Sequence, residues 1–167
     1  MDGIEPVTEI DQLRDAFGCF PSGVAAVCAL LDDVPVGLVA SSFTSVSLDP
    51  PLVSVCMQHS SRTWPALRRM PRLGVSVLAE GQDDICSRLA RKTGDRFAGT
   101  EWSASADGSV FVHGATLSLD CTIHAEVPSG DHDIVLLRIH GLRADPSTPP
   151  LVFHGSRYRR LAPSWLI

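Results

Sequence analysis

The feature that most constrains the fold is a pair of long strand-like segments joined by a tight turn in the second half of the chain. Residues 116–127 alternate apolar and polar side chains with a period of two, as a half-buried strand does. The apolar positions, which would share one face, are Leu117, Leu119, Cys121, Ile123 and Ala125. A turn at 129–132 and a second apolar strand at 133–144 follow. Together they predict an antiparallel pair of long strands.

Shorter apolar runs, bounded by Gly, Pro, Ser and Asp, predict further strands at 23–31, 34–43, 51–57, 73–78 and 151–153. Only three short helices are predicted, at 8–19, 62–70 and 82–91, the first of them capped by Thr8. Residues 92–113, rich in Gly, Ser, Asp and Thr, are expected to form a long loop. Six or more strands with few helices predict a mainly β protein, an antiparallel barrel rather than a doubly wound sheet.

Composition and charge narrow the classes of function. A chain of 167 residues is expected to form a single domain, 1–167. Its formal net charge of −5 argues against a nucleic acid partner. No apolar stretch approaches the roughly 20 residues that cross a membrane, and the acidic N-terminal segment is not a signal peptide. The five cysteines show neither metal-ligand nor disulfide spacing, so we expect no metal site and a cytoplasmic location.

Two polar clusters follow predicted strands. Residues 39–51 carry the hydroxyls of Ser41, Ser42, Thr44, Ser45 and Ser47, which could hold a phosphate or the polar edge of a ligand. The alternative is an ordinary solvated loop. Residues 59–63 open a predicted helix, whose free N–H groups attract anions, and they include an arginine. The alternative is that a hydroxyl there only caps the helix.

A third candidate is the turn Gly130–Asp131–His132, where a histidine could face a pocket or simply lie on the surface. No glycine-rich nucleotide loop of the GxGxxG type follows a strand, and no serine lies in a nucleophile motif. The residues alone therefore predict a β-barrel with an anion pocket, without specifying a reaction.

Six segments, taken together and in order, resemble the flavin reductase family, the small reductase components of two-component flavin-dependent monooxygenases. They are FPSGV (20–24), VGLVASSFTSVSLDPPL (36–52), SRT (61–63), GVSVLAEGQ (74–82), DRF (95–97) and GDH (130–132). The resemblance runs from about residue 13 to 161. It implies a split β-barrel of the FMN-binding type, usually a homodimer with its flavin sites near the interface.

The resemblance also implies site residues. Those expected along the flavin ring and ribityl chain are Val39, Ala40, Ser41 and Ser42, with Cys56 beside them. Those expected at the phosphate are Ser61, Arg62 and Thr63, covered by a loop that includes Ala79 and Gln82. Ser22, Phe97 and Tyr158 are further cofactor-binding candidates, and His132 is expected near the nicotinamide. The chain departs from the family at Leu38-Val39, Ser76 and Leu89, where Met-Thr, Asn and Phe are usual.

The expected activity is hydride transfer from NADH to free FAD or FMN, with release of the reduced flavin to a partner monooxygenase. In this interpretation His132 positions the nicotinamide and does not act as a base. Two alternatives stay open: a reductase that keeps its flavin bound and acts on another substrate, and a non-catalytic flavin- or haem-binding module. The choices between FAD and FMN, and between NADH and NADPH, stay open as well.

Overall fold

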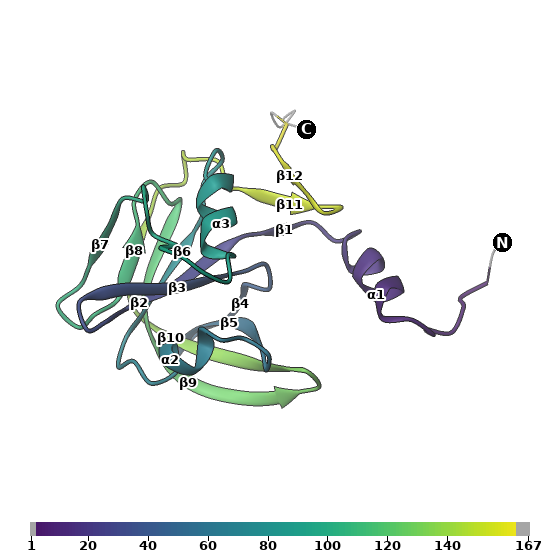
Figure 1. The fold of residues 1–167 in the computed structure, drawn as a ribbon, viewed down its shortest axis with the longest axis horizontal. Helices are drawn as coiled ribbons and strands as arrows, with labels where there is room; N and C mark the ends of the chain where they lie inside the picture. The colour runs from purple at the N-terminus through teal and green to yellow at the C-terminus, as the bar shows by residue number, and fades with distance from the viewer. Residues whose placement is uncertain (1–2, 163–167) are drawn as a thin grey trace.

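A computed structural model describes residues 3–162, which form a curled antiparallel sheet with small additions at its edges (Figure 1). The main sheet has seven strands in the order β3-β2-β6-β9-β10-β5-β4. Their bounds are Val34–Ala40 (β3), Ala25–Leu31 (β2), Leu73–Val77 (β6), Leu117–Ser129 (β9), His132–Ala144 (β10), Pro51–Gln58 (β5) and Thr44–Leu48 (β4). The predicted mainly β, antiparallel architecture is confirmed.

Two smaller sheets and three helices complete the fold. The small strands are β1 (Ser22–Gly23), β11 (Val152–His154) and β12 (Arg157–Arg159) in one sheet, and β7 (Trp102–Ala104) and β8 (Val110–Val112) in another. The helices are α1 (Ile10–Phe17), α2 (Trp64–Leu67) and α3 (Asp83–Leu89). No helix among residues 3–162 is both long enough and apolar enough to cross a membrane.

Several local predictions need correction. The segment 92–113 is not one loop, because it contains the β7–β8 hairpin, and the hydroxyl-rich segment continues as the edge strand β4. The helix predicted at 62–70 is a single turn. Thr8 does not cap α1: the side-chain oxygen of Gln12 accepts the backbone N–H groups of Thr8 and Glu9, at 3.0 and 3.1 Å, and so satisfies the start of the helix.

Strand β2 carries the core on both of its faces. Its residues Ala25, Val27 and Ala29 belong to the apolar cluster inside the curled sheet, where α2 also packs. Alternate residues, Ala26 and Cys28, belong to a second cluster under α3 and β8 on the outer face. Burial on both faces explains why this strand is an unbroken apolar run rather than an alternating one. Burial also raises the pKa of the Cys28 thiol to about 12, as expected for an inert core cysteine.

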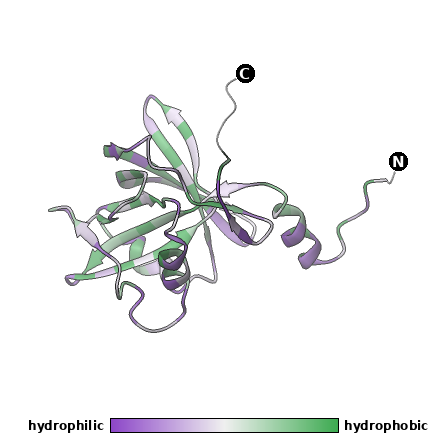
Figure 2. Cartoon of the chain, turned by 90° about the horizontal axis from the view of Figure 1, so that it is seen from above, coloured by the Kyte–Doolittle hydropathy of each residue, from purple (hydrophilic) through white to green (hydrophobic). Residues whose placement is uncertain are grey.

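Helix α1 stands away from the body in both views (Figures 1 and 2). None of its residues is buried, although its sequence is amphipathic. The side chains of Ile10 and Phe17 are both 71% exposed, and Phe20 just beyond the helix is 79% exposed. An apolar helix face in water is unfavourable, so this surface is expected to have a partner.

Strand β8 packs directly against the backbone of Gly74 in β6. A Cβ atom at this position would overlap the backbone carbonyl oxygen of Val110 in β8. Because the obstacle is backbone rather than a flexible side chain, the strand β8 would have to move to accommodate it.

We therefore expect Gly74→Ala to lower the free energy of unfolding by about 2 kcal/mol, as overpacking of a dense core does. The matched control is Gly23→Ala in β1, where a Cβ would meet nothing within 4 Å. Urea unfolding of both variants measures the difference. Equal stability of Gly74→Ala and the control would contradict this account of the packing between β6 and β8.

Candidate functional site

A cavity of about 690 Å³ opens where the ends of β3 and β5, the start of β10, the start of α2 and the end of α3 meet. Its lining includes the predicted residues Val39, Ala40, Ser41, Ser42, Cys56, Ser61, Arg62, Thr63 and His132. These residues come from four separate parts of the sequence, and the curl of the sheet brings them together. The volume lies within the range of small-molecule and cofactor sites, roughly 300–1,000 Å³.

The wall formed by β3 is an open sheet edge. Strand β3 is the first in the sheet order and pairs only with β2, so one side of its backbone has no strand partner among the described residues. Beyond the strand, Ser42 bonds across to β5: its hydroxyl accepts the backbone N–H of Cys56 at 2.8 Å. The hydroxyl of Ser42 is thus used to hold the two ends of the sheet together. This leaves for a ligand the hydroxyl of Ser41 and those backbone groups of residues 39–41 that point away from β2.

The segment 60–63 forms a second wall. The hydroxyl of Ser61 accepts the backbone N–H of Trp64 at 3.1 Å, so it supports the first turn of α2. Since α2 has only four residues, its dipole is too small to bind an anion strongly. The attraction for anions that we expected from this helix must therefore come from side-chain charges.

Cationic side chains supply that charge. The lining includes Arg62, Arg91, Lys92 and Arg96 but no aspartate or glutamate. None of the four forms an ion pair within residues 3–162. In a chain of net charge −5, such a concentration of unpaired cations around one cavity favours an anionic ligand.

Arg96 is held in place by neutral acceptors from three separate parts of the chain. Its Nη1 donates to the Thr63 hydroxyl at 2.9 Å and to the backbone oxygens of Gly37 and Leu89 at 3.3 and 3.5 Å. These contacts orient the guanidinium but do not neutralise it, so its charge is available to a phosphate. Sequence reasoning missed Arg91, Lys92 and Arg96; the signals were the chain's only lysine and the arginine beside Phe97.

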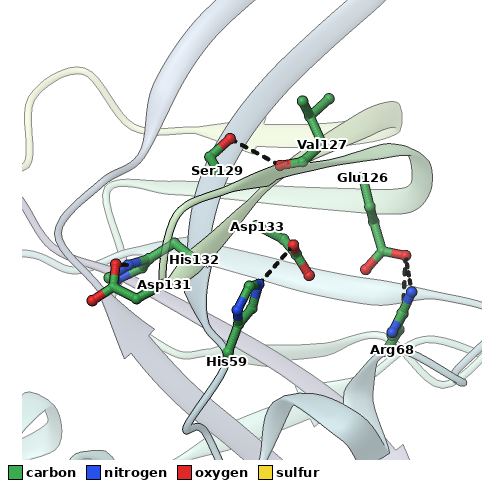
Figure 3. Close-up of polar contacts among 8 residues, drawn as sticks. All are labelled: His59, Arg68, Glu126, Val127, Ser129, Asp131, His132 and Asp133. Carbon is green, nitrogen blue, oxygen red and sulfur yellow. Dashed lines mark hydrogen bonds and ion pairs between the residues drawn. The ribbon is translucent and has the colours of Figure 1, made fainter.

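His132 is the first residue of β10, lines the cavity and pairs in register with Gln58 at the end of β5. Figure 3 shows its ring beside the Asp131 carboxylate. Its Nδ1 lies 2.7 Å from the Asp131 carboxylate, and this hydrogen bond lowers the pKa of Asp131. A proton held on Nδ1 leaves Nε2 as the ring atom that is free to meet a ligand.

Five predicted residues do not line this cavity. Ala79 and Gln82 are bonded to each other, the Gln82 side chain accepting the Ala79 N–H at 2.8 Å and donating to the His113 carbonyl at 2.8 Å. Phe97 is buried in the outer apolar cluster. The structure accounts for these three side chains by packing and by hydrogen bonds within the chain, and their role in binding stays a prediction.

The other two, Ser22 and Tyr158, belong to the three-stranded sheet. Ser22 pairs with Phe153, and the Tyr158 ring packs on the same phenylalanine with 5.6 Å between centroids. The Tyr158 hydroxyl lies 3.0 Å from the Cys86 sulfur; burial and this contact raise the pKa of Tyr158 to about 12. Their contact with a ligand also stays a prediction. No group of three metal-ligating side chains is found in the described part of the chain.

Together these walls suit a ligand that joins a planar polar ring to one or more phosphates. The open edge of β3 can pair with a ring that carries hydrogen-bonding groups, and the four cations can bind phosphates. A flavin nucleotide has both parts, so the residues present fit the cofactor that the resemblance implies.

Comparison with known proteins agrees with this chemistry. An actinorhodin polyketide dimerase of Streptomyces coelicolor is 39% identical over 150 residues, which cover 89% of this chain and 85% of that protein. The reductase subunit of a flavin-dependent monooxygenase from Mycobacterium tuberculosis is 36% identical over 152 residues, covering 90% and 81%.

Among solved structures, an NADH:FAD oxidoreductase of Streptomyces globisporus, in complex with NAD and FAD fragments, superposes with a TM-score of 0.89. It is 36% identical, and the match covers 96% of this chain and 98% of that one. Residues 17–162 match the family model described as a flavin reductase like domain. The chain therefore belongs to the flavin reductase-like domain family.

Proposed function

We propose that this chain is an NAD(P)H:flavin oxidoreductase that prefers NADH, reduces free FAD or FMN, and passes the reduced flavin to a partner monooxygenase. The observation that carries the proposal is one cavity that combines an open strand edge, four unpaired cations and a histidine oriented by a carboxylate. The NADH preference is supported by the related NADH:FAD oxidoreductase.

Each wall of the cavity has a role in this proposal. The backbone of residues 39–41 holds the polar edge of the flavin ring, with Cys56 beside it, and Arg62 and Arg96 hold its phosphates. His132 orients the nicotinamide over the ring from the other side. The flavin itself supplies the hydride-accepting chemistry, and the protein supplies orientation and charge. No proton donor is required at the hydride step.

Release of the product limits how tightly the flavin can bind. An association rate of about 10⁶ M⁻¹s⁻¹ and turnover of about 10 s⁻¹ together require a Kd for the departing flavin of roughly 10 μM. A nanomolar site would release flavin about ten-thousand-fold too slowly. Weak binding of reduced flavin is therefore part of the proposal.

A second candidate keeps the flavin bound and acts on another substrate. The relative named as a polyketide dimerase rather than as a flavin reductase supports action on another substrate. The two candidates differ in whether the flavin leaves the protein, so exhaustive dialysis followed by an absorbance spectrum separates them.

We also propose a homodimer in the cytoplasm. The exposed apolar face of α1, which nothing in the described chain covers, supports an assembly of two copies. The five free cysteines support a reducing compartment.

The proposed activity is tested by following NADH and NADPH oxidation with riboflavin, FMN and FAD in turn. We expect flavin-dependent oxidation that is faster with NADH, and a dialysed protein that holds no stoichiometric flavin. No oxidation with any flavin would leave only a binding role. Flavin retained after dialysis would favour the second candidate.

A substitution at Arg96 distinguishes binding of the flavin phosphate from binding of the flavin ring. Replacing this arginine with methionine removes a charged donor, which is worth about 1.5–3 kcal/mol, so we expect the Kd for FMN to rise roughly 10- to 100-fold. Riboflavin, which lacks the phosphate, should bind as before. The control Arg143→Met makes the same change of charge on β10 away from the cavity. Fluorescence titration measures all three proteins, and an equal loss for riboflavin and FMN would show that Arg96 only maintains the fold.

A further inference from the structure

The turn that carries His132 is attached to the end of β5 by the backbone of His59. The His59 N–H donates to the Asp131 carbonyl at 2.9 Å, and His132 pairs in register with Gln58. Any movement of residue 59 relative to the turn would therefore displace His132.

The side chain of His59 makes a second attachment to the same turn (Figure 3). Its Nε2 lies 2.9 Å from the carboxylate of Asp133, the residue that follows His132. The Asp133 side chain is only 18% exposed, while that of His59 is 49% exposed. A carboxylate this far buried needs its partner, because removing the imidazole would leave the charge poorly satisfied.

Neither His59 nor Asp133 lines the cavity, yet each adjoins a residue or segment that does. His59 comes directly before the segment 60–63, which carries Arg62 and contacts Arg96 through Thr63. Asp133 comes directly after His132. The pair therefore connects the phosphate side of the cavity to the histidine on its nicotinamide side.

We propose that His59 and Asp133 are a positioning pair that fixes His132 relative to the flavin-binding segment 60–63. This rests on the proposed function, because it assigns His132 to the nicotinamide. A displacement of about 1 Å at a reacting centre can reduce the rate a hundredfold, so a contact outside the cavity can control hydride transfer.

Three variants test the pair. His59→Ala removes the side-chain contact, whereas His59→Gln retains an N–H donor that can reach Asp133. The matched control is His140→Ala, which removes a histidine contact between β9 and β10, where the ring Nε2 lies 2.8 Å from the Thr122 hydroxyl. We expect His59→Ala to lower kcat/KM for NADH about tenfold, His59→Gln to restore most of it, and the Kd for FMN to change less than twofold in both.

The double variant His59→Ala/His132→Ala shows whether His59 acts through His132. We expect His132→Ala alone to impair NADH turnover, and His59→Ala to add less than a twofold loss in that background. A further tenfold loss of kcat/KM in the double variant would overturn the proposal. So would a single variant His59→Ala that behaves like the control, or one that weakens FMN binding as much as NADH turnover.

An NMR spectrum of the histidine rings provides a readout that needs no activity. We expect His59→Ala to shift the ring resonances of His132, and His140→Ala to leave them in place. If the wild-type protein did not oxidise NADH, the proposed function would fail while this shift would still establish the positioning contact. If the wild-type protein oxidises NADH but the His132 resonances do not shift in His59→Ala, the positioning role of His59 and Asp133 is overturned.

Discussion

The hydrogen bond from the Cys56 N–H to the Ser42 hydroxyl determines the shape on which the site depends. It ties the short segment between β3 and β4 to β5, and that segment connects the two edge strands of the seven-stranded sheet. A continuous ladder of backbone bonds would have closed the barrel and left no free polar groups. The chain instead crosses from β3 to β4 with this side-chain contact and no backbone ladder, which leaves the outer side of β3 open. The cavity lies along that open edge, and a flavin ring can complete the pairing that the strand lacks.

Electrostatics determines which ligands this edge can accept. A chain with an excess of acidic residues nevertheless places four unpaired cations around one cavity, and one of them, Arg96, is fixed by three neutral acceptors. Like charges gathered around one cavity repel one another in the free protein, and an anion that binds among them relieves that repulsion. Cations such as Arg62 and Lys92 are exposed to water, which weakens their attraction for a phosphate. The bound flavin can therefore be released. This balance fits a protein that must let its flavin go.

Patterns that act over a few residues were predictable from the sequence. The period of two in residues 116–127 correctly predicted β9, and the apolar run at 23–31 correctly predicted the strand β2. Strands β7 and β8 were missed because each has only three residues and the segment around them is rich in Gly, Ser, Asp and Thr, as loops are. The residues of the candidate site likewise fall into those that a local pattern predicted and those that it did not. Hydroxyls at a strand end and the 130–132 turn were found locally, whereas Arg96 reaches the cavity only because the segment after α3 packs against β3. Gln82 also accepts the Ala79 N–H, a contact that no local pattern reveals, and its role at a ligand stays a prediction.

The most direct test of the central claim is a crystal structure of the protein with FAD and NAD⁺ bound. The flavin ring is expected against the backbone of residues 39–41 and beside Cys56, with its phosphates at Arg62 and Arg96 and the nicotinamide in contact with His132. A flavin bound away from the open edge of β3, or a nicotinamide remote from His132, would contradict the account.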